Sequence, residues 1–192
     1  MSTLKLIAGL GNPGAKHERD RHNVGVWFVS RLAAGQRVEL KAVAKYHGLM
    51  GKLARPSGDV WLLLPQTYMN LSGKSVGALA RFYRILPEEV LIAHDELDFQ
   101  PGAAKLKLGG GVAGHNGLKD VAAHLGTQGF WRLRIGIGHP GDKSLVAGYV
   151  LNSPSKPERE LIETALARCL DIAELLVDGD MQAAMLRLHT KS

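Results

Sequence analysis

The chain has 192 residues, 45% of them hydrophobic and 22% charged, which is typical of one globular α/β domain and excludes a disordered protein. Its apolar runs are all shorter than the about 18 residues that a membrane span requires, and its N-terminus lacks the pattern of a secretory signal, so we expect a cytoplasmic protein without membrane contact. The formal net charge of +6 comes from residues 1–150, which carry 19 Lys and Arg against 11 Asp and Glu, and this excess favours a polyanionic partner such as nucleic acid over a basic surface with no partner.

The first predicted element is a short strand that ends in a glycine-rich turn. Residues 4–10 are mostly apolar, and Gly9, Gly11, Pro13 and Gly14 end the run with a turn. A helical period follows over residues 24–33, with Asn23 as its predicted cap. His22 then lies beside a helix N-terminus, whose partial positive charge disfavours imidazolium and favours a neutral, basic ring. A capping or surface role for His22 is the alternative.

The same turn matches the Gly-x-Gly-x-x-Gly pattern of dinucleotide-binding proteins. In that fold the helix begins at the glycines, so that the pyrophosphate meets its N-terminus, whereas here the helical pattern begins only after His22. Pro13 also removes a backbone N–H that the phosphate would need. That fold requires an acidic residue about 20 residues after the glycines, and Glu39 lies too far along the chain and in a polar segment. We therefore expect no nicotinamide and no other cofactor.

The next elements are a strand hairpin or meander within residues 37–53, a strand over 60–64, and a helix that contains Val76, Leu79, Ala80 and Tyr83. Gly73-Lys74-Ser75 resembles the end of a phosphate-binding loop, but Tyr68 stands where that loop requires glycine. Gly73-x-Ser75-x-Gly77 resembles the turn that carries a nucleophilic serine, yet Pro65 ends the strand too early for it. A serine esterase with Ser75 as nucleophile is kept as an alternative.

A strand over residues 90–93 ends in a cluster of acids that contains Asp95. The cluster lacks the spaced histidines or the oxygen-rich loop of a metal site, so we expect no metal and interpret one acid as the partner of a histidine. After a strand over 103–108, the glycines of 109–117 predict a mobile loop that brings backbone N–H groups close to a ligand, with a flexible connection as the alternative. Asn116 lies at the entrance of the helix that follows.

The last part of the chain is predicted to contain a strand over 130–137, a turn over 138–143, a short extended piece over 149–151, and two amphipathic helices over 157–177 and 181–188. Cys169, the single cysteine, lies in an apolar helical run, which favours burial over chemistry and is typical of a reducing compartment. No domain boundary is evident. We expect one domain over 1–192, on which the C-terminal helices at 157–189 pack, and a monomer.

Polar residues recur at the predicted ends of strands and starts of helices. If the strands are mostly parallel, these ends converge on one rim of a twisted mixed sheet that has helices on both faces. The residues concerned are Asn12, His22, Asn70, Asp95 and Asn116. Three carboxamides, one imidazole and one carboxylate form a hydrolytic set that needs neither a metal nor a nucleophilic side chain.

Six blocks of residues, in order along the chain, resemble the motifs of bacterial-type peptidyl-tRNA hydrolases. The blocks are Gly9-Leu10-Gly11-Asn12-Pro13-Gly14, Arg21-His22-Asn23, Met69-Asn70-Leu71-Ser72-Gly73, His94-Asp95-Glu96-Leu97-Asp98, Gly114-His115-Asn116-Gly117-Leu118-Lys119 and Arg134-Ile135-Gly136-Ile137-Gly138. The resemblance implies cleavage of the ester between a peptide and the terminal ribose of tRNA. It implies that His22 is the general base, that Asp95 is its partner, and that Asn12 contacts the peptide.

The same resemblance implies that Asn70 and Asn116 hold the substrate, and we include Tyr68 and Met69 beside Asn70 in this set. The family often has tyrosine where this chain has His17, so His17 is a second titrating group among the expected substrate contacts.

Basic residues near the expected site are candidates for the phosphates of tRNA. They are Lys107, Arg134 and Lys143. Such contacts give an affinity that falls with salt and carries little sequence preference. An RNA-binding module of the same fold without catalysis is the alternative, although such a module would need the basic face and not the base.

Overall fold

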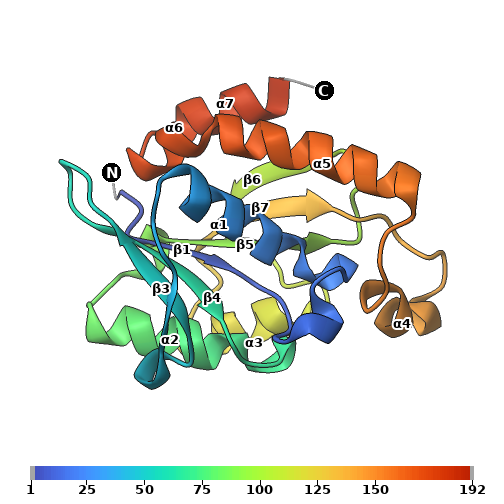
Figure 1. Cartoon of the computed structure of the whole chain (residues 1–192), viewed down its shortest axis with the longest axis horizontal. Coiled ribbons are helices and arrows are strands. Elements are labelled where there is room, and N and C mark those ends of the chain that lie inside the picture. The colour runs from blue at the N-terminus through green and yellow to red at the C-terminus, as the bar shows by residue number, and fades with distance from the viewer. Residues whose placement is uncertain (1–2, 191–192) are drawn as a thin grey trace.

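The computed structural model describes residues 3–190 and is built around a seven-stranded sheet with the order β2-β3-β4-β1-β5-β7-β6 (Figure 1). The strands are β1 (Leu6–Gly9), β2 (Lys41–Val43), β3 (Gly48–Leu53), β4 (Val60–Pro65), β5 (Val90–Glu96), β6 (Ala104–Leu108) and β7 (Trp131–Gly136). The central strands β4, β1, β5 and β7 are parallel, whereas β2, β3 and β6 pair antiparallel with their neighbours. The predicted mixed, largely parallel sheet is confirmed.

Helices cover both faces of this sheet, as predicted (Figure 1). One face packs against α1 (Val24–Gly35), α5 (Lys156–Asp171), α6 (Ala173–Val177) and α7 (Met181–Thr190), and the other against α2 (Ser72–Phe82) and α3 (Asn116–Leu125). The short helix α4 (Val146–Val150) lies at one end of the molecule. Within residues 3–190, no helix is both long enough and apolar enough to cross a membrane.

The two faces have separate cores because successive residues of a strand point to opposite sides. In β1, Ile7 joins the core that contains Phe28 of α1 and Ile162 of α5. Its neighbour Leu6 joins the core that contains Leu79 of α2. Both sides of the central strands are therefore buried, which explains why β4 and β5 have continuous apolar runs instead of alternation.

The structure differs from the predictions at three places. Residues 149–150 belong to helix α4 and not to an extended piece, because three residues are too few to define a period. The helix predicted over 157–177 is divided at Ile172, whose φ of −97° and ψ of 6° leave the helical region while its side chain stays buried. Asn23 does not cap α1 with its side chain, which instead bonds to Asn12.

Candidate active site

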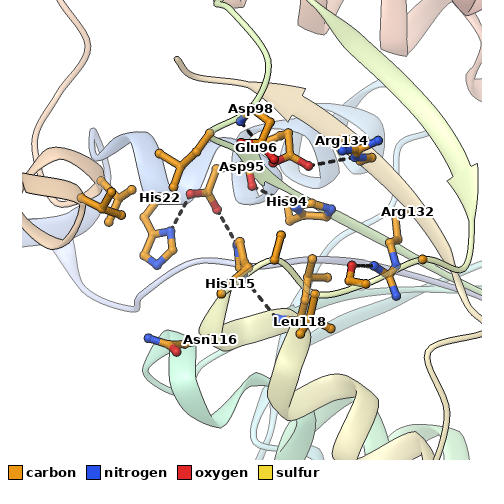
Figure 2. Close-up of a pocket in the computed structure, with 18 of the residues that line it drawn as sticks. His22, His94, Asp95, Glu96, Asp98, His115, Asn116, Leu118, Arg132 and Arg134 are labelled. Carbon is orange, nitrogen blue, oxygen red and sulfur yellow. Dashed lines mark hydrogen bonds and ion pairs between the residues drawn. The ribbon is translucent and has the colours of Figure 1, made fainter. Parts of the chain in front are cut away.

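A cleft of about 780 Å³ opens at the carboxyl ends of β5 and β7, where open α/β sheets place their ligand sites (Figure 2). Its walls come from these strand ends, the glycine-rich loop 109–114, the start of α3 and helix α4. The cleft brings together six of the residues selected from the sequence: His22, Asp95, Lys107, Asn116, Arg134 and Lys143.

Two glycines allow α1 to approach the sheet closely beside this cleft. A methyl group on Gly25 would collide with the carbonyl of Ala93 in β5, and one on Gly9 would collide with the carbonyl of Gly25. Only glycine permits backbones to come this near. His22 lies in the short 3-10 helix η2 (Arg21–Asn23) that leads into α1, so this contact brings its ring to the end of β5.

His22 and Asp95 form a hydrogen bond in which Nδ1 of the ring is 2.8 Å from Oδ2 of the carboxylate (Figure 2). The carboxylate is acceptor only, so Nδ1 carries the proton and Nε2 of the neutral ring is unprotonated. Among residues 3–190, Nε2 has no hydrogen-bond partner. A basic nitrogen thus remains available on a ring whose orientation is fixed by its hydrogen bond to Asp95.

His115 binds the other oxygen of the same carboxylate and is the residue that the sequence analysis missed. Its Nε2 is 2.8 Å from Oδ1 of Asp95, and its Nδ1 accepts the backbone N–H of Leu118 at 3.1 Å. Both ring nitrogens therefore have partners, which excludes His115 as a free base in this arrangement. Its position between the glycine-rich loop and Asn116 was a signal that could have drawn attention to it.

The charges in this cluster shift the pKa values in opposite directions. Burial by itself lowers the pKa of His22, but the facing charge and hydrogen bond of Asp95, together with the charge of Asp20, raise it above the ordinary 6.5. Burial by itself raises the pKa of Asp95, and the charges and hydrogen bonds of His22 and His115 more than offset this and hold it well below its usual range. The prediction that the ring is kept neutral is contradicted by this direction, which the two carboxylates set.

His94 lies behind the pair and packs edge-on against His115, with ring centroids 5.2 Å apart. Its Nδ1–H donates to the backbone carbonyl of Asp95 at 2.8 Å. Burial, with the nearby charges of His115 and Arg132, lowers the pKa of His94 to about 3. The ring is therefore a neutral support for the end of β5.

Asn12 joins the turn after β1 to the segment before α2. Its Oδ1 accepts the backbone N–H of Met69 at 2.6 Å, and its backbone exchanges two hydrogen bonds of 2.9 Å with the side chain of Asn23. With Oδ1 engaged, the side-chain amide group presents its Nδ2 donor, which has no partner within the described residues. Met69 is buried and packs against Gly117 at the start of α3.

Residues 6–192 match the family model described as peptidyl-tRNA hydrolase. The chain belongs to this family. The peptidyl-tRNA hydrolase of Nitrosospira multiformis is 57% identical over 188 residues, which are 98% of each chain. That of Shewanella loihica is 56% identical over 191 residues, covering 99% of this chain and 98% of the relative. The resemblance inferred from the six motifs is confirmed.

The fold agrees with this peptidyl-tRNA hydrolase assignment. The crystal structure of peptidyl-tRNA hydrolase from Acinetobacter baumannii matches with a TM-score of 0.94 and 49% identity, over 98% of this chain and 95% of that chain. The backbone match therefore covers almost the whole chain, from the sheet to the C-terminal helices.

Five of the predicted site residues do not line the cleft: Asn12, His17, Tyr68, Met69 and Asn70. Tyr68 and Asn70 are exposed on the segment before α2. His17 is the last residue of the 3-10 helix η1 (Ala15–His17), and its Nδ1 is 2.7 Å from Oδ2 of the buried Asp20. Their contacts with substrate stay predictions.

The three predicted basic residues differ in their partners. Arg134 donates from Nε to Glu96 at 2.8 Å (Figure 2). Its guanidinium lies 4.4 Å from the centroid of the Phe99 ring. Lys107 and Lys143 are exposed at the cleft, and within residues 3–190 neither has a carboxylate at ion-pair distance. Unlike Arg134, the two lysines are thus not paired with a carboxylate within the described residues.

Possible metal ligands also converge here, since His22, Asp95 and His115 offer donor atoms within 4.8 Å of one another. The fold therefore brings two histidines from distant segments to Asp95, although none is suitably spaced from the acidic cluster in the sequence. These atoms already bond directly to each other, and a metal would have to break both hydrogen bonds to Asp95. We interpret the cluster as a hydrogen-bonded triad, and the absence of a metal stays a prediction.

Proposed function

We propose that this protein hydrolyses the ester bond between the peptide and the tRNA of peptidyl-tRNA, which releases free tRNA, and that His22 is the general base. Family membership supports the reaction. The observation that supports the base is the free Nε2 of a ring that Asp95 holds at 2.8 Å beside the cleft. An ester has a good leaving group, so an activated water suffices.

In the proposed reaction, Nε2 of His22 takes a proton from water while the water oxygen attacks the carbonyl carbon of the ester. The imidazolium that forms is stabilised by Asp95, whose carboxylate stays ionised. When the tetrahedral intermediate collapses, the ribose oxygen leaves and takes up the proton from the imidazolium. His115 keeps Asp95 in place throughout by binding its second oxygen.

Neutral side chains are proposed to bind the peptide and the tetrahedral oxyanion. A carboxamide both donates and accepts hydrogen bonds, so it recognises a peptide main chain regardless of the side chains. Asn116 lines the cleft, and Asn12 binds the backbone of Met69, whose side chain packs against Gly117 beside Asn116. We propose that these two residues bind the substrate together with Asn70 and the nearby Tyr68. We also propose that His17 contacts the substrate.

For tRNA, we propose that Lys107 and Lys143 contact phosphates near the acceptor end and that Arg134 does so while held by Glu96. The basic excess of residues 1–150 supports such a partner. We further propose that the protein acts in the cytoplasm as a monomer without an obligate protein partner.

The test is release of tRNA from an N-blocked aminoacyl-tRNA by the purified protein without added metal. We expect His22→Ala to lower kcat about 10²-fold or more while tRNA binding is largely kept. His139→Ala, which changes another histidine of the same cleft, is the matched control and should turn over normally. Normal turnover by His22→Ala would remove the general-base assignment, and tRNA binding without release by the wild type would favour the RNA-binding module.

The serine-esterase alternative is disfavoured by the position of Ser75. Its side chain is fully buried within α2, and its hydroxyl donates to the backbone carbonyl of Tyr46 at 2.6 Å. An ester has no access to this oxygen.

A further inference from the structure

Four aromatic side chains line a shallow groove of about 580 Å³ beside strands β2 and β3, at the antiparallel edge of the sheet. We call this feature the aromatic groove and define it by its rings and its lysines: Tyr46, Trp61, Phe82 and Tyr83, with Lys41, Lys45 and Lys52. Within the described chain, it shares no lining residue with the catalytic cleft. It is therefore a second concave surface.

The rings of the groove form one connected set. Trp61 and Tyr83 are stacked, with centroids 4.5 Å apart and planes at 28°. Phe82 meets Tyr83 edge-on at 4.9 Å and Tyr46 edge-on at 5.7 Å. Such geometry holds the rings in fixed orientations, and Phe82 and Tyr83 keep an exposed surface while Tyr46 is buried beneath them.

The end of α2 explains why two of these rings remain outside the core. The helix buries Val76, Leu79 and Ala80 and ends at Phe82, and the next turn places Arg84 at a φ of 54°. As a result, Phe82 is 57% exposed and Tyr83 38%. Contiguous exposed apolar side chains rimmed by polar residues are a feature of binding surfaces.

The charge of the groove identifies the partner. Nζ of Lys45 lies 3.8 Å from the centroid of Phe82, and Lys41 and Lys52 stand on strands β2 and β3 beside it. Their acidic neighbours, Glu39 at 3.7 Å from Lys41 and Asp59 at 3.9 Å from Lys52, form exposed pairs of little strength. Lysines around aromatic rings are the combination that binds unpaired nucleotides, because bases stack on rings while phosphates meet ammonium groups.

We propose that the aromatic groove binds unpaired nucleotides of the tRNA substrate outside its acceptor end, with a base against Phe82 and Tyr83 and phosphates facing Lys41, Lys45 and Lys52. This inference rests on the proposed function, which makes a tRNA the ligand. A second copy of this chain fits the groove poorly, because a two-fold contact would place the lysines of one copy against those of the other.

The experiment compares two substrates of the same chemistry: a full-length N-blocked aminoacyl-tRNA and a short RNA that has only the acceptor end with the same blocked aminoacyl ester. For Phe82→Ala and for Lys45→Glu, we expect KM for the full-length substrate to rise about tenfold, the loss of one stacked base, with kcat unchanged. KM for the short substrate should not change. Leu186→Ala removes another exposed apolar side chain, on α7, and Lys156→Glu makes the same charge change on α5. Both controls should behave like the wild type.

If both variants have the same KM for full-length tRNA as the wild type, the inference is overturned. It is also overturned if KM rises equally for both substrates, because this would indicate a structural effect on the cleft. Dimerisation of the wild type that Phe82→Ala abolishes would assign the groove to a second copy. If the wild type cleaves neither substrate, the proposed function fails. In that case fluorescence anisotropy with uncharged tRNA decides on the groove, and equal affinity of Phe82→Ala and wild type would reject it.

Discussion

The carboxylate of Asp95 receives a hydrogen bond of 2.8 Å from His115 on the oxygen that faces away from His22 (Figure 2). Asp95 is 2% exposed, so few other groups are available to satisfy that oxygen. The two histidines therefore share one buried charge. Only His22 has a ring nitrogen left for chemistry, since Leu118 occupies the remaining nitrogen of His115.

We expect His115→Ala to lower kcat by about 10-fold to 100-fold with a small effect on KM, because it removes a hydrogen bond to a buried charge that is worth about 1.5–3 kcal/mol. The carboxylate would then be free to turn away from His22. Steady-state kinetics measures the effect, with His124→Ala on the exposed side of α3 as control. An unchanged kcat would show that His22 alone holds Asp95.

The acid limb of the pH profile should report His22. Protonation of Nε2 removes the base, so kcat/KM falls as the pH decreases through the raised pKa of this ring. Because the charge of Asp20 contributes to that rise, Asp20→Asn should move the limb to lower pH while the amide keeps the contact to His17. Glu18→Gln removes an exposed charge two residues earlier and is the control. A limb that stays in place or moves to higher pH would contradict the assignment.

His94 should make the protein less stable in acid. Its pKa is lowered to about 3 in the folded protein, whereas the unfolded chain binds a proton near 6.5. The unfolded state therefore binds more protons between these values, and stability that is complete above pH 6.5 is lost as the pH falls toward 3, at up to about 1.4 kcal/mol per pH unit. Urea unfolding from pH 7 to pH 5 should show a shallower loss for His94→Gln than for wild type. Equal slopes would mean that the ring takes up its proton while folded.

Asn12→Asp separates the structural role of this residue from its proposed contact with substrate. The carboxylate keeps an oxygen for the N–H of Met69 but has no donor in place of Nδ2. We expect a Tm near that of the wild type and a loss of kcat/KM of about 10-fold or more, as for a lost donor to a developing oxyanion. Asn12→Ala should lose both. A fully active Asn12→Asp would show that the donor is not used.

The two free lysines of the cleft should contribute to affinity in a salt-dependent way. Lys107→Gln and Lys143→Gln should each weaken tRNA binding and reduce the slope of log Kd against log salt by about 0.7–0.9 if each contacts one phosphate. Fluorescence anisotropy over a salt series measures this, and Lys156→Gln on α5 is the control. A slope equal to that of wild type would place the phosphates elsewhere.

The sequence alone was sufficient for the class of fold, for the family and for six of the residues that line the cleft. Strands, helices and glycine turns depend on local periodicity and backbone sterics, which a single chain expresses directly. The order of the six motif blocks along the chain matches the family. His22 and Asp95 were therefore selected as partners although they are 73 positions apart in the sequence. The extent of the domain and the roles of the individual site residues stay predictions.

Only the tertiary structure decided which partners each polar atom has. Asn23 was expected to cap α1, but its amide bonds to the backbone of Asn12, because the close packing of Gly9 and Gly25 brings the two turns together. His115 acquires its role because α3 begins beside the end of β5. The pKa of His22 is raised because η2 brings its ring to the carboxylate of Asp95, with the charge of Asp20 adding to the effect. Hydrogen bonds and charge interactions depend on distances of a few ångströms between segments far apart in the chain, and sequence periodicity carries no information about such distances.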